Sequence, residues 1–217
     1  RNTKDMDITV LRLGHRPLRD KRLTTHLLLC ARALGAGSAI YSGERDRKLE
    51  KTIEDLVDQW GGDFWLEYTD SYRKVIKEWK GKKIHLTMYG YPVQKAVTEI
   101  QSYDEPLLII VGGPKVPADI YYLSDWNISV TTQPHSEVSA LAIFLHVLLE
   151  GRELDMDFPD AKIKVTPSRE GKDVEYLTGL DRWLEDAQDV VVLGGGFIGI
   201  EFGDEINKLK DKDVTVI

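Results

Sequence analysis

The run Leu-Leu-Ile-Ile-Val at residues 107–111 limits the possible folds most, because every position in it is apolar. A strand without a polar face must be covered on both sides, as central strands of parallel sheets are. Between residues 8 and 150, short apolar runs alternate with longer amphipathic stretches, which predicts an α/β domain with a mainly parallel sheet. We expect strands at 8–13, 38–41, 64–68, 83–88, 107–111 and 128–131, and helices at 21–34, 46–60, 70–79, 91–102, 118–124 and 136–150.

The helix expected at 136–150 is apolar on almost every side. A helix without a polar face has to be buried, either inside its own domain or against a second subunit. The sequence therefore leaves both possibilities open for this helix.

Composition is that of a soluble globular protein, with 42% hydrophobic and 30% charged residues in 217. The one cysteine, Cys30, cannot form an intrachain disulfide, which favours a reducing compartment. No apolar run approaches the roughly 20 residues that cross a bilayer, and the first residues lack the apolar core of a signal peptide. We therefore expect a cytoplasmic protein without a membrane span.

The character of the chain changes after Gly151. Residues 152–171 are polar, contain two prolines, and predict a loop or one short extended segment around 163–165. A second unit with its own strands and helices begins near residue 172. The sequence thus predicts two domains, at 1–171 and 172–217.

The charge of the chain divides at the same place. The net charge of -7 argues at first against a nucleic-acid partner, because neutralising phosphates is the largest sequence-independent part of such binding. Residues 172–217 hold 5 basic and 11 acidic residues, whereas residues 1–171 hold 24 and 25. The first unit is thus almost neutral, and its residues 12–22 carry five basic side chains opposed only by Asp20. Such a cluster is either a solvated face or a surface for phosphates.

Three segments end predicted strands and carry residues that an ordinary α/β domain does not need. They are Leu-Arg-Leu-Gly-His-Arg-Pro at 11–17, His-Leu-Thr-Met-Tyr-Gly at 85–90, and Val-Gly-Gly-Pro-Lys-Val-Pro at 111–117 with Thr-Thr-Gln-Pro-His-Ser-Glu at 131–137. Open α/β sheets bind ligands at the carboxyl ends of their strands. Paired glycines let the backbone approach a ligand, although any tight turn between a strand and a helix uses them too. His85 and His135 could be metal ligands, but without a cysteine or carboxylate cluster we favour satisfied or solvated histidines.

Together, the segments LRLGHRPxRDKRxTTH, HLTMYG, VGGPKVP and QPHSEVSALAIFL resemble, over about residues 7–170, the archaeal tRNA cytidine-56 2′-O-methyltransferases of the SPOUT superfamily. The resemblance implies a SPOUT-type trefoil-knotted parallel sheet flanked by helices and a homodimer. It also implies S-adenosylmethionine as methyl donor and the T-loop of tRNA as substrate.

The same resemblance implies that the methyl donor binds in the loops that follow three strands. The residues concerned are Leu86, Gly112, Gly113, Pro114, Lys115, Val116, Val130, Thr131, Thr132, Gln133, Pro134, His135, Ser136 and Glu137. Much of this contact would come from the backbone, since peptide groups can bind both the adenine and the amino-acid part of the donor.

Wider SPOUT ribose methyltransferases carry an Asn and, six residues later, an Arg on their first helix. His26 and Arg32 keep that spacing here, which implies a catalytic pair in which Arg32 positions the ribose or a neighbouring phosphate. Arg32 cannot be a base, because a guanidinium stays protonated at physiological pH. The RNA backbone would then be bound by the basic cluster, namely by Arg12, Arg16, Arg19 and Arg22.

The last segment resembles another class of protein. Gly194, Gly196 and Gly199 have G-x-G-x-x-G spacing between a strand expected at 190–193 and a helix that ends near 209, as at the opening of the NAD(P)H-binding domain of pyridine-nucleotide-disulfide oxidoreductases. A last strand is expected at 214–217. About 45 residues cannot bury enough surface to fold alone, so we expect an incomplete Rossmann-like βαβ segment without dinucleotide function. Two alternatives stay open, a fragment of an NAD(P)H- or flavin-dependent oxidoreductase and a non-catalytic RNA-binding dimer.

Overall fold

A computed structural model describes residues 6–113, 115–177, 189–192 and 213–216 of the chain. The chain divides into two compact units, residues 1–159 and residues 160–217. None of the helices in the described ranges has both the length and the apolar character of a membrane span.

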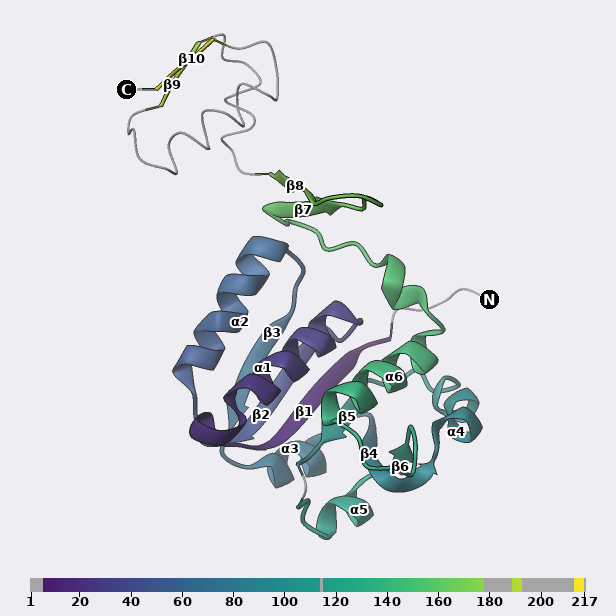
Figure 1. Ribbon diagram of the computed structural model, residues 1–217. Helices are drawn as coiled ribbons and strands as arrows, with labels where there is room; N and C mark the ends of the chain where they lie inside the picture. The colour runs from purple at the N-terminus through teal and green to yellow at the C-terminus, as the bar shows by residue number, and fades with distance from the viewer. Residues whose placement is uncertain (1–5, 114, 178–188, 193–212, 217) are drawn as a thin grey trace. The chain divides into compact units, whose positions relative to one another are not determined.

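The first unit is built on a six-stranded parallel sheet with the order β3-β2-β1-β5-β4-β6 (Figure 1). Its strands are β1 (Ile8–His15), β2 (Ser38–Gly43), β3 (Trp65–Thr69), β4 (Lys82–Pro92), β5 (Leu107–Val111) and β6 (Trp126–Ser129). The apolar strand β5 lies between β1 and β4 and is buried along its whole length. The predicted α/β class and all six predicted strands are confirmed.

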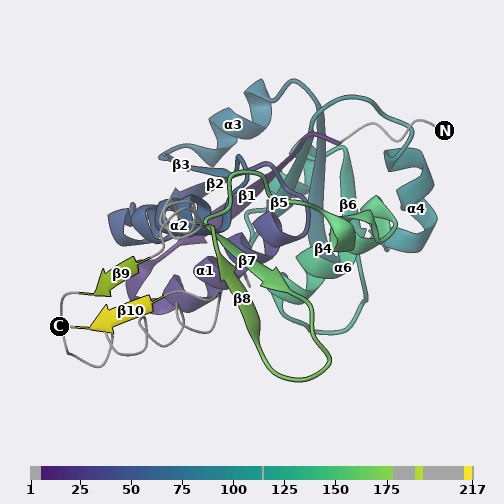
Figure 2. The same cartoon turned by 90° about the horizontal axis from the view of Figure 1, so that it is seen from above.

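Helices cover both faces of this sheet, and Figure 2 shows α1 and α3 on opposite sides of it. The helices are α1 (Pro17–Ala33), α2 (Arg47–Trp60), α3 (Tyr72–Glu78), α4 (Val93–Ile100), α5 (Asp119–Leu123) and α6 (Glu137–Leu149), followed by a short 3-10 turn, η1 (Arg152–Asp155). The larger apolar cluster joins one sheet face to α1, α2, α4 and α6, and the smaller one joins the other face to α3 and α5. The six predicted helices are therefore confirmed.

Strand β1 shows how the sequence alternates between these two clusters. Ile8 and Val10 belong to the larger cluster, whereas Leu11 and Leu13 belong to the smaller one. Because side chains alternate along a strand, Arg12 points to the same face as Ile8 and Val10. A charged side chain is thereby directed toward the face that α1 and α6 cover.

Helix α6 buries one face in its own domain. Six of its residues are buried, and it packs against α1 and α4. Ile143 on the opposite side is 48% exposed. The sequence predicted that every side of this helix is buried, whereas the first unit buries only one face of it.

Strand β4 is longer than the predicted 83–88, because it contains a bulge. Leu86 and Tyr91 both pair with Ile128 of β6, so the residues between them leave the regular register. At Gly90 a Cβ atom would lie 2.6 Å from the backbone of Asn127 and Ile128, which only glycine avoids. The bulge displaces residues 87–90 of β4 from the regular hydrogen-bond ladder, at the carboxyl edge of the sheet.

The second unit contains two pairs of short strands. An antiparallel hairpin joins β7 (Ile163–Thr166) to β8 (Asp173–Tyr176), where the sequence predicted one extended segment in a loop. The predicted domain boundary after residue 171 falls between these two strands. Strands β9 (Asp189–Val192) and β10 (Asp213–Val216) pair in parallel and confirm the two predicted strands. The helix and the glycines 194, 196 and 199 predicted between them lie outside the described residues.

Candidate active site

A cleft of about 660 Å³ opens at the carboxyl edge of the sheet in the first unit. It lies among the turns that follow β1, β2 and β5, where a parallel sheet is expected to bind its ligand. Its lining consists of Arg12, Leu13, Gly14, His15, Arg16, Arg19, Asp20, Gly43, Glu44, Tyr72, Gly113, Lys115, Val116 and Pro117. Basic side chains thus converge on the loop that the sequence assigned to the methyl donor.

Arg12 has the least usual environment of these residues. Its side chain is only 2% exposed, and its Nε and Nη1 atoms are buried without a hydrogen-bond partner among the residues that the structure describes. Burial lowers the pKa of its guanidinium, while the carboxylates of Glu137 and Asp20 oppose that decrease. A buried charged group that lacks hydrogen bonds costs stability and calls for a functional explanation.

Asp20 connects Arg12 to the more exposed basic residues. Its Oδ1 accepts a 2.8 Å hydrogen bond from Arg19 Nε, and its Oδ2 lies 3.6 Å from Arg16 Nε. The bond from Arg19 holds the pKa of this carboxyl below its ordinary value, although burial alone would raise it. A carboxylate this acidic is a weak proton acceptor, so electrostatic orientation suits Asp20 better than general-base catalysis.

The structure thus gathers three of the four predicted RNA contacts at the cleft. The side chains of Arg16 and Arg19 are 51% and 58% exposed at its rim, and Arg12 lies buried in its wall. Arg22 is exposed on α1 but does not line the cleft. A half-exposed cation can exchange water for a phosphate at little cost, which suits Arg16 and Arg19 to bind RNA.

The loops predicted to hold the methyl donor begin side by side. Leu86 pairs with Val111 in β5 and with Ile128 in β6, so the chain leaves all three strands at one level. Gly113, Lys115 and Val116 line the cleft, and a Cβ at Gly113 would lie 3.9 Å from the Glu137 carboxylate. Pro114 lies outside the described residues.

The loop from Val130 to Glu137 is open to solvent. Val130 and Glu137 at its ends are partly buried, and its exposed residues are Thr131, Thr132, Gln133, Pro134, His135 and Ser136. Ser136 caps α6 by accepting a 3.2 Å hydrogen bond from the Val138 N–H. Most of this predicted donor loop therefore leaves its polar groups accessible to a ligand.

Arg32 and His26 lie away from the cleft. Arg32 follows Asp20 on α1 by about 18 Å of helix, near the end where α1 terminates. Its Nη2 donates to the carbonyl oxygens of Trp60 (2.9 Å) and Gly61 (2.6 Å), and its guanidinium lies 4.5 Å from the centre of the Phe158 ring. His26 is exposed in the middle of the helix. The catalytic pair implied by the resemblance stays a prediction, and these contacts favour a structural role for Arg32.

The two histidines considered as metal ligands lie in different environments, one buried and one exposed. His85 is fully buried, and since Asn127 Nδ2 donates to the Tyr121 carbonyl, Asn127 Oδ1 accepts from His85 Nδ1 at 2.9 Å. Burial lowers the pKa of this imidazole, which favours its neutral form. His135 is exposed, with Nδ1 2.6 Å from the Gln133 carbonyl oxygen. Nothing in these contacts resembles a shared ligand set.

Three residues at or next to the cleft had no role in the sequence prediction, namely Asp20, His15 and Asp46. Asp20 counted only as a charge that opposes the basic cluster. His15 follows Arg12 within a conspicuous motif, and Asp46 is the first residue of the helix predicted at 46–60, where an Asp is a common N-cap. The sequence marks each of these three positions, but it does not show that they lie close together, because that follows from the pairing of β1 with β2.

Comparison with solved structures defines the class of this fold. A TrmH/SpoU tRNA-modifying enzyme from A. aeolicus matches 70% of this chain and 79% of its own with a TM-score of 0.52 at 14% identity. An RNA 2′-O ribose methyltransferase matches 70% of this chain and 59% of its own with a TM-score of 0.51 at 14% identity. The first unit therefore has the SpoU/TrmH methyltransferase fold of the SPOUT class.

Sequence relatives identify the family within that class. Residues 60–175 match the model of the tRNA ribose 2′-O-methyltransferase family aTrm56. The tRNA (cytidine(56)-2′-O)-methyltransferase of Methanothermobacter thermautotrophicus is 52% identical over 77% of this chain and 95% of its own. The enzyme of the same name from Pyrococcus horikoshii is 49% identical over 79% of this chain and 86% of its own. The chain belongs to the aTrm56 family and is a tRNA ribose 2′-O-methyltransferase.

Proposed function

We propose that this enzyme methylates the ribose 2′-hydroxyl of cytidine 56 in the T-loop of tRNA, with S-adenosylmethionine as donor and with Arg12 as the residue that positions the target nucleotide. The names of the relatives support the target. The observation that carries the site is the buried, incompletely bonded guanidinium of Arg12 beside the predicted donor loop.

Arg12 suits this task because its charge is fixed before the substrate arrives. A buried guanidinium with two nitrogens unpartnered among the described residues can donate strong hydrogen bonds to the ribose 2′-oxygen or an adjacent phosphate without first losing other protein partners. Asp20 and Glu137, whose charges act on Arg12, belong to the rim of the cleft and to the first turn of α6, respectively. We infer that Arg12 holds the ribose or an adjacent phosphate in line with the donor, while Arg16 and Arg19 bind the RNA backbone.

The residues present at the donor loops fit S-adenosylmethionine, which supplies an activated methyl group on a sulfonium. At Gly112 a Cβ would lie 2.2 Å from Val116 Cγ2, so glycine permits this close approach within the loop. The structure of the SpoU methyltransferase AviRb, a complex with AdoMet, shares the fold with a TM-score of 0.50. We assign the donor to Leu86, to the loop after Gly112, and to the segment from Val130 to Glu137.

We further propose that the enzyme acts in the cytoplasm as a homodimer. Ile143 is 48% exposed on the outer side of α6, next to the partly buried Ala142, and a second copy of the chain would cover this side. A dimer would also double the basic surface offered to tRNA. The trefoil knot implied for this class stays a prediction.

A methyl-transfer assay on unmodified tRNA transcripts tests the function as a whole. We expect one methyl group per tRNA at the ribose of position 56, and no transfer to a transcript that carries 2′-deoxycytidine there. Titration with NADH is the counter-test for the oxidoreductase alternative. Tight NADH binding by a chain that neither binds S-adenosylmethionine nor modifies tRNA would refute our assignment.

The donor loop can be tested separately at Gly112. The variant Gly112→Ala forces a methyl group against Val116, so the loop must shift and donor affinity should fall by about tenfold or more, as overpacking a tight site costs roughly 1–3 kcal/mol. Isothermal titration with S-adenosylmethionine measures the change. Gly37→Ala is the matched control, because a Cβ there meets nothing within 4 Å. Unchanged donor affinity in Gly112→Ala would exclude the loop from the donor site.

A further inference from the structure

Two turns at the carboxyl edge of the sheet form adjoining walls of the cleft. The first, Gly14 to Arg16, leads from β1 into α1, and the second, Gly43 to Asp46, leads from β2 into α2. The Glu44 N–H donates to the His15 carbonyl oxygen at 2.8 Å, and the Gly14 N–H donates to Ser42 Oγ at 3.2 Å. At Gly43 a Cβ would lie 2.3 Å from the His15 carbonyl oxygen, so only glycine permits this approach.

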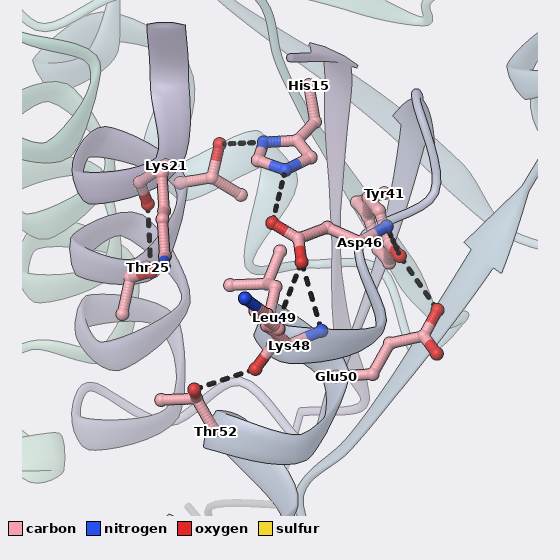
Figure 3. Close-up of polar contacts among 10 residues, drawn as sticks. His15, Lys21, Thr25, Tyr41, Asp46, Lys48, Leu49, Glu50 and Thr52 are labelled. Carbon is pink, nitrogen blue, oxygen red and sulfur yellow. Dashed lines mark hydrogen bonds and ion pairs between the residues drawn. The ribbon is translucent and has the colours of Figure 1, made fainter. Parts of the chain in front are cut away.

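The imidazole of His15 joins the same two turns through the interior (Figure 3). It is fully buried, with Nδ1 2.9 Å from Thr24 Oγ1 on α1 and Nε2 3.4 Å from Asp46 Oδ2 before α2. A carboxylate can only accept, so Nε2 carries the proton toward Asp46. In the neutral imidazole Nδ1 then accepts from the Thr24 hydroxyl, which fixes the tautomer.

Asp46 in turn is anchored firmly. Its Oδ1 accepts from the N–H groups of Lys48 and Leu49 at 3.0 and 3.1 Å, which caps α2. Its own N–H donates to Tyr41 Oη at 2.9 Å, and Tyr41 donates to Glu50 Oε1 at 2.7 Å (Figure 3). Burial opposes ionisation of Asp46, but its bonds from Leu49, His15 and Lys48 hold its pKa below the ordinary value. Asp46 is therefore a rigidly held carboxylate, and His15 links α1 to it.

An Asp–His–Thr chain of this kind could also suggest a nucleophile activated by a base. Thr24 is fully buried and does not line the cleft, so no substrate reaches its hydroxyl. The hydrogen bond between Thr24 and His15 instead serves to position the start of α1. That helix begins at Pro17 without a side-chain cap at Arg16, yet its first turn carries Arg16, Arg19 and Asp20. The hydrogen bond between Thr24 and His15 holds the start of α1 in place, which a side-chain cap at Arg16 does not do.

We propose that His15 is a positioning residue for tRNA, which holds the first turn of α1 against the fixed start of α2 so that Arg16 and Arg19 face the RNA backbone. The proposal rests on the proposed function, in which the cleft receives the tRNA. The two side-chain contacts act in series, because the link from α1 to α2 through the His15 imidazole exists only while both are intact. Breaking either one should therefore have the same effect as breaking both.

Three variants test this arrangement in the full-length chain. Gln at position 15 places an amide nitrogen near Nε2 and keeps a donor for Asp46, but it offers Thr24 no acceptor near Nδ1. We expect His15→Gln, Thr24→Val and the double variant each to raise KM for tRNA by about tenfold, with kcat within about threefold and donor affinity unchanged. Assays run well below the melting temperature of every variant. Steady-state kinetics with varied tRNA and titration with S-adenosylmethionine measure the three quantities.

Any other outcome refutes a specific part of the proposal. A merely structural role would lower the melting temperature and leave both kcat and KM unchanged under these conditions. Independent contacts would multiply to about a hundredfold in the double variant. The variant Arg16→Ala with Arg19→Ala tests the cleft itself. If its KM for tRNA does not change, the cleft is not the tRNA site. If its KM rises while that of His15→Gln does not, the cleft stands and only the role of His15 is refuted.

Discussion

Replacing Arg12 with methionine is expected to reduce kcat/KM for tRNA by about 10²-fold, the loss typical of a misplaced substrate, without lowering the melting temperature. The guanidinium is buried with two nitrogens unbonded, so its removal relieves a desolvation cost rather than breaking a network. Asp20 keeps its bond from Arg19, and Glu137 is only partly buried. The protein should therefore melt at the same temperature or a few degrees higher while it loses methyl transfer.

Three measurements establish this combination, namely tRNA methylation, titration with S-adenosylmethionine and thermal melting followed by circular dichroism. Donor affinity should stay within about threefold, because the residues assigned to the donor lie on other loops. Arg47→Met, on an exposed residue of α2 outside the cleft, is the matched control and should keep full activity. Arg12→Lys separates charge from geometry, since a lysine keeps the charge but not the planar fork of donors. Full activity in Arg12→Met would remove Arg12 from the site.

Much of the fold could be predicted because the first unit obeys simple periodicities. Strand β5 is apolar throughout and lies in the centre of the sheet. The start of α1 was placed four residues late, since Pro17 was not recognised as a first helical residue. The hairpin of β7 and β8 was predicted only in part, because Ile163 and Val165 alternate with polar residues and indicate one extended segment, whereas Val174 and Tyr176 alternate over too few residues to indicate a second strand.

The site was predicted less completely because it depends on burial and on contacts between distant segments. Charge alone identified Arg12, Arg16 and Arg19, but did not distinguish the buried one from the exposed ones. The alternation of Ile8, Val10 and Arg12 along β1 contains that information, since it places Arg12 on the sheet face that α1 and α6 cover. The pairing of His15 with Asp46 spans 31 positions and follows only from the parallel register of β1 and β2.

Arg32→Ala should have the opposite effect to Arg12→Met, namely a large loss of stability with little loss of catalysis. Its Nη2 holds two carbonyl oxygens at the end of α2, and its guanidinium stacks on Phe158. Next to this contact, the Gly62 N–H donates to the Pro159 carbonyl at 2.7 Å. Removal of two charge-assisted hydrogen bonds and a cation–π contact costs roughly 2–5 kcal/mol. For a chain of this size, this corresponds to a fall in melting temperature of roughly 5–15 °C.

The decisive comparison for Arg32 is activity per folded molecule, measured at a temperature where the variant is still fully folded. We expect kcat and KM within about threefold of the original enzyme, because Asp20 at the cleft lies about 18 Å along α1 from Arg32. Arg47→Ala, at an exposed position of α2 outside the cleft, controls for loss of an arginine as such, and it should change neither melting nor activity. If Arg32→Ala instead melts normally and transfers no methyl group, the catalytic role implied by the His26 and Arg32 spacing is correct, and the contacts at Trp60, Gly61 and Phe158 contribute little to stability.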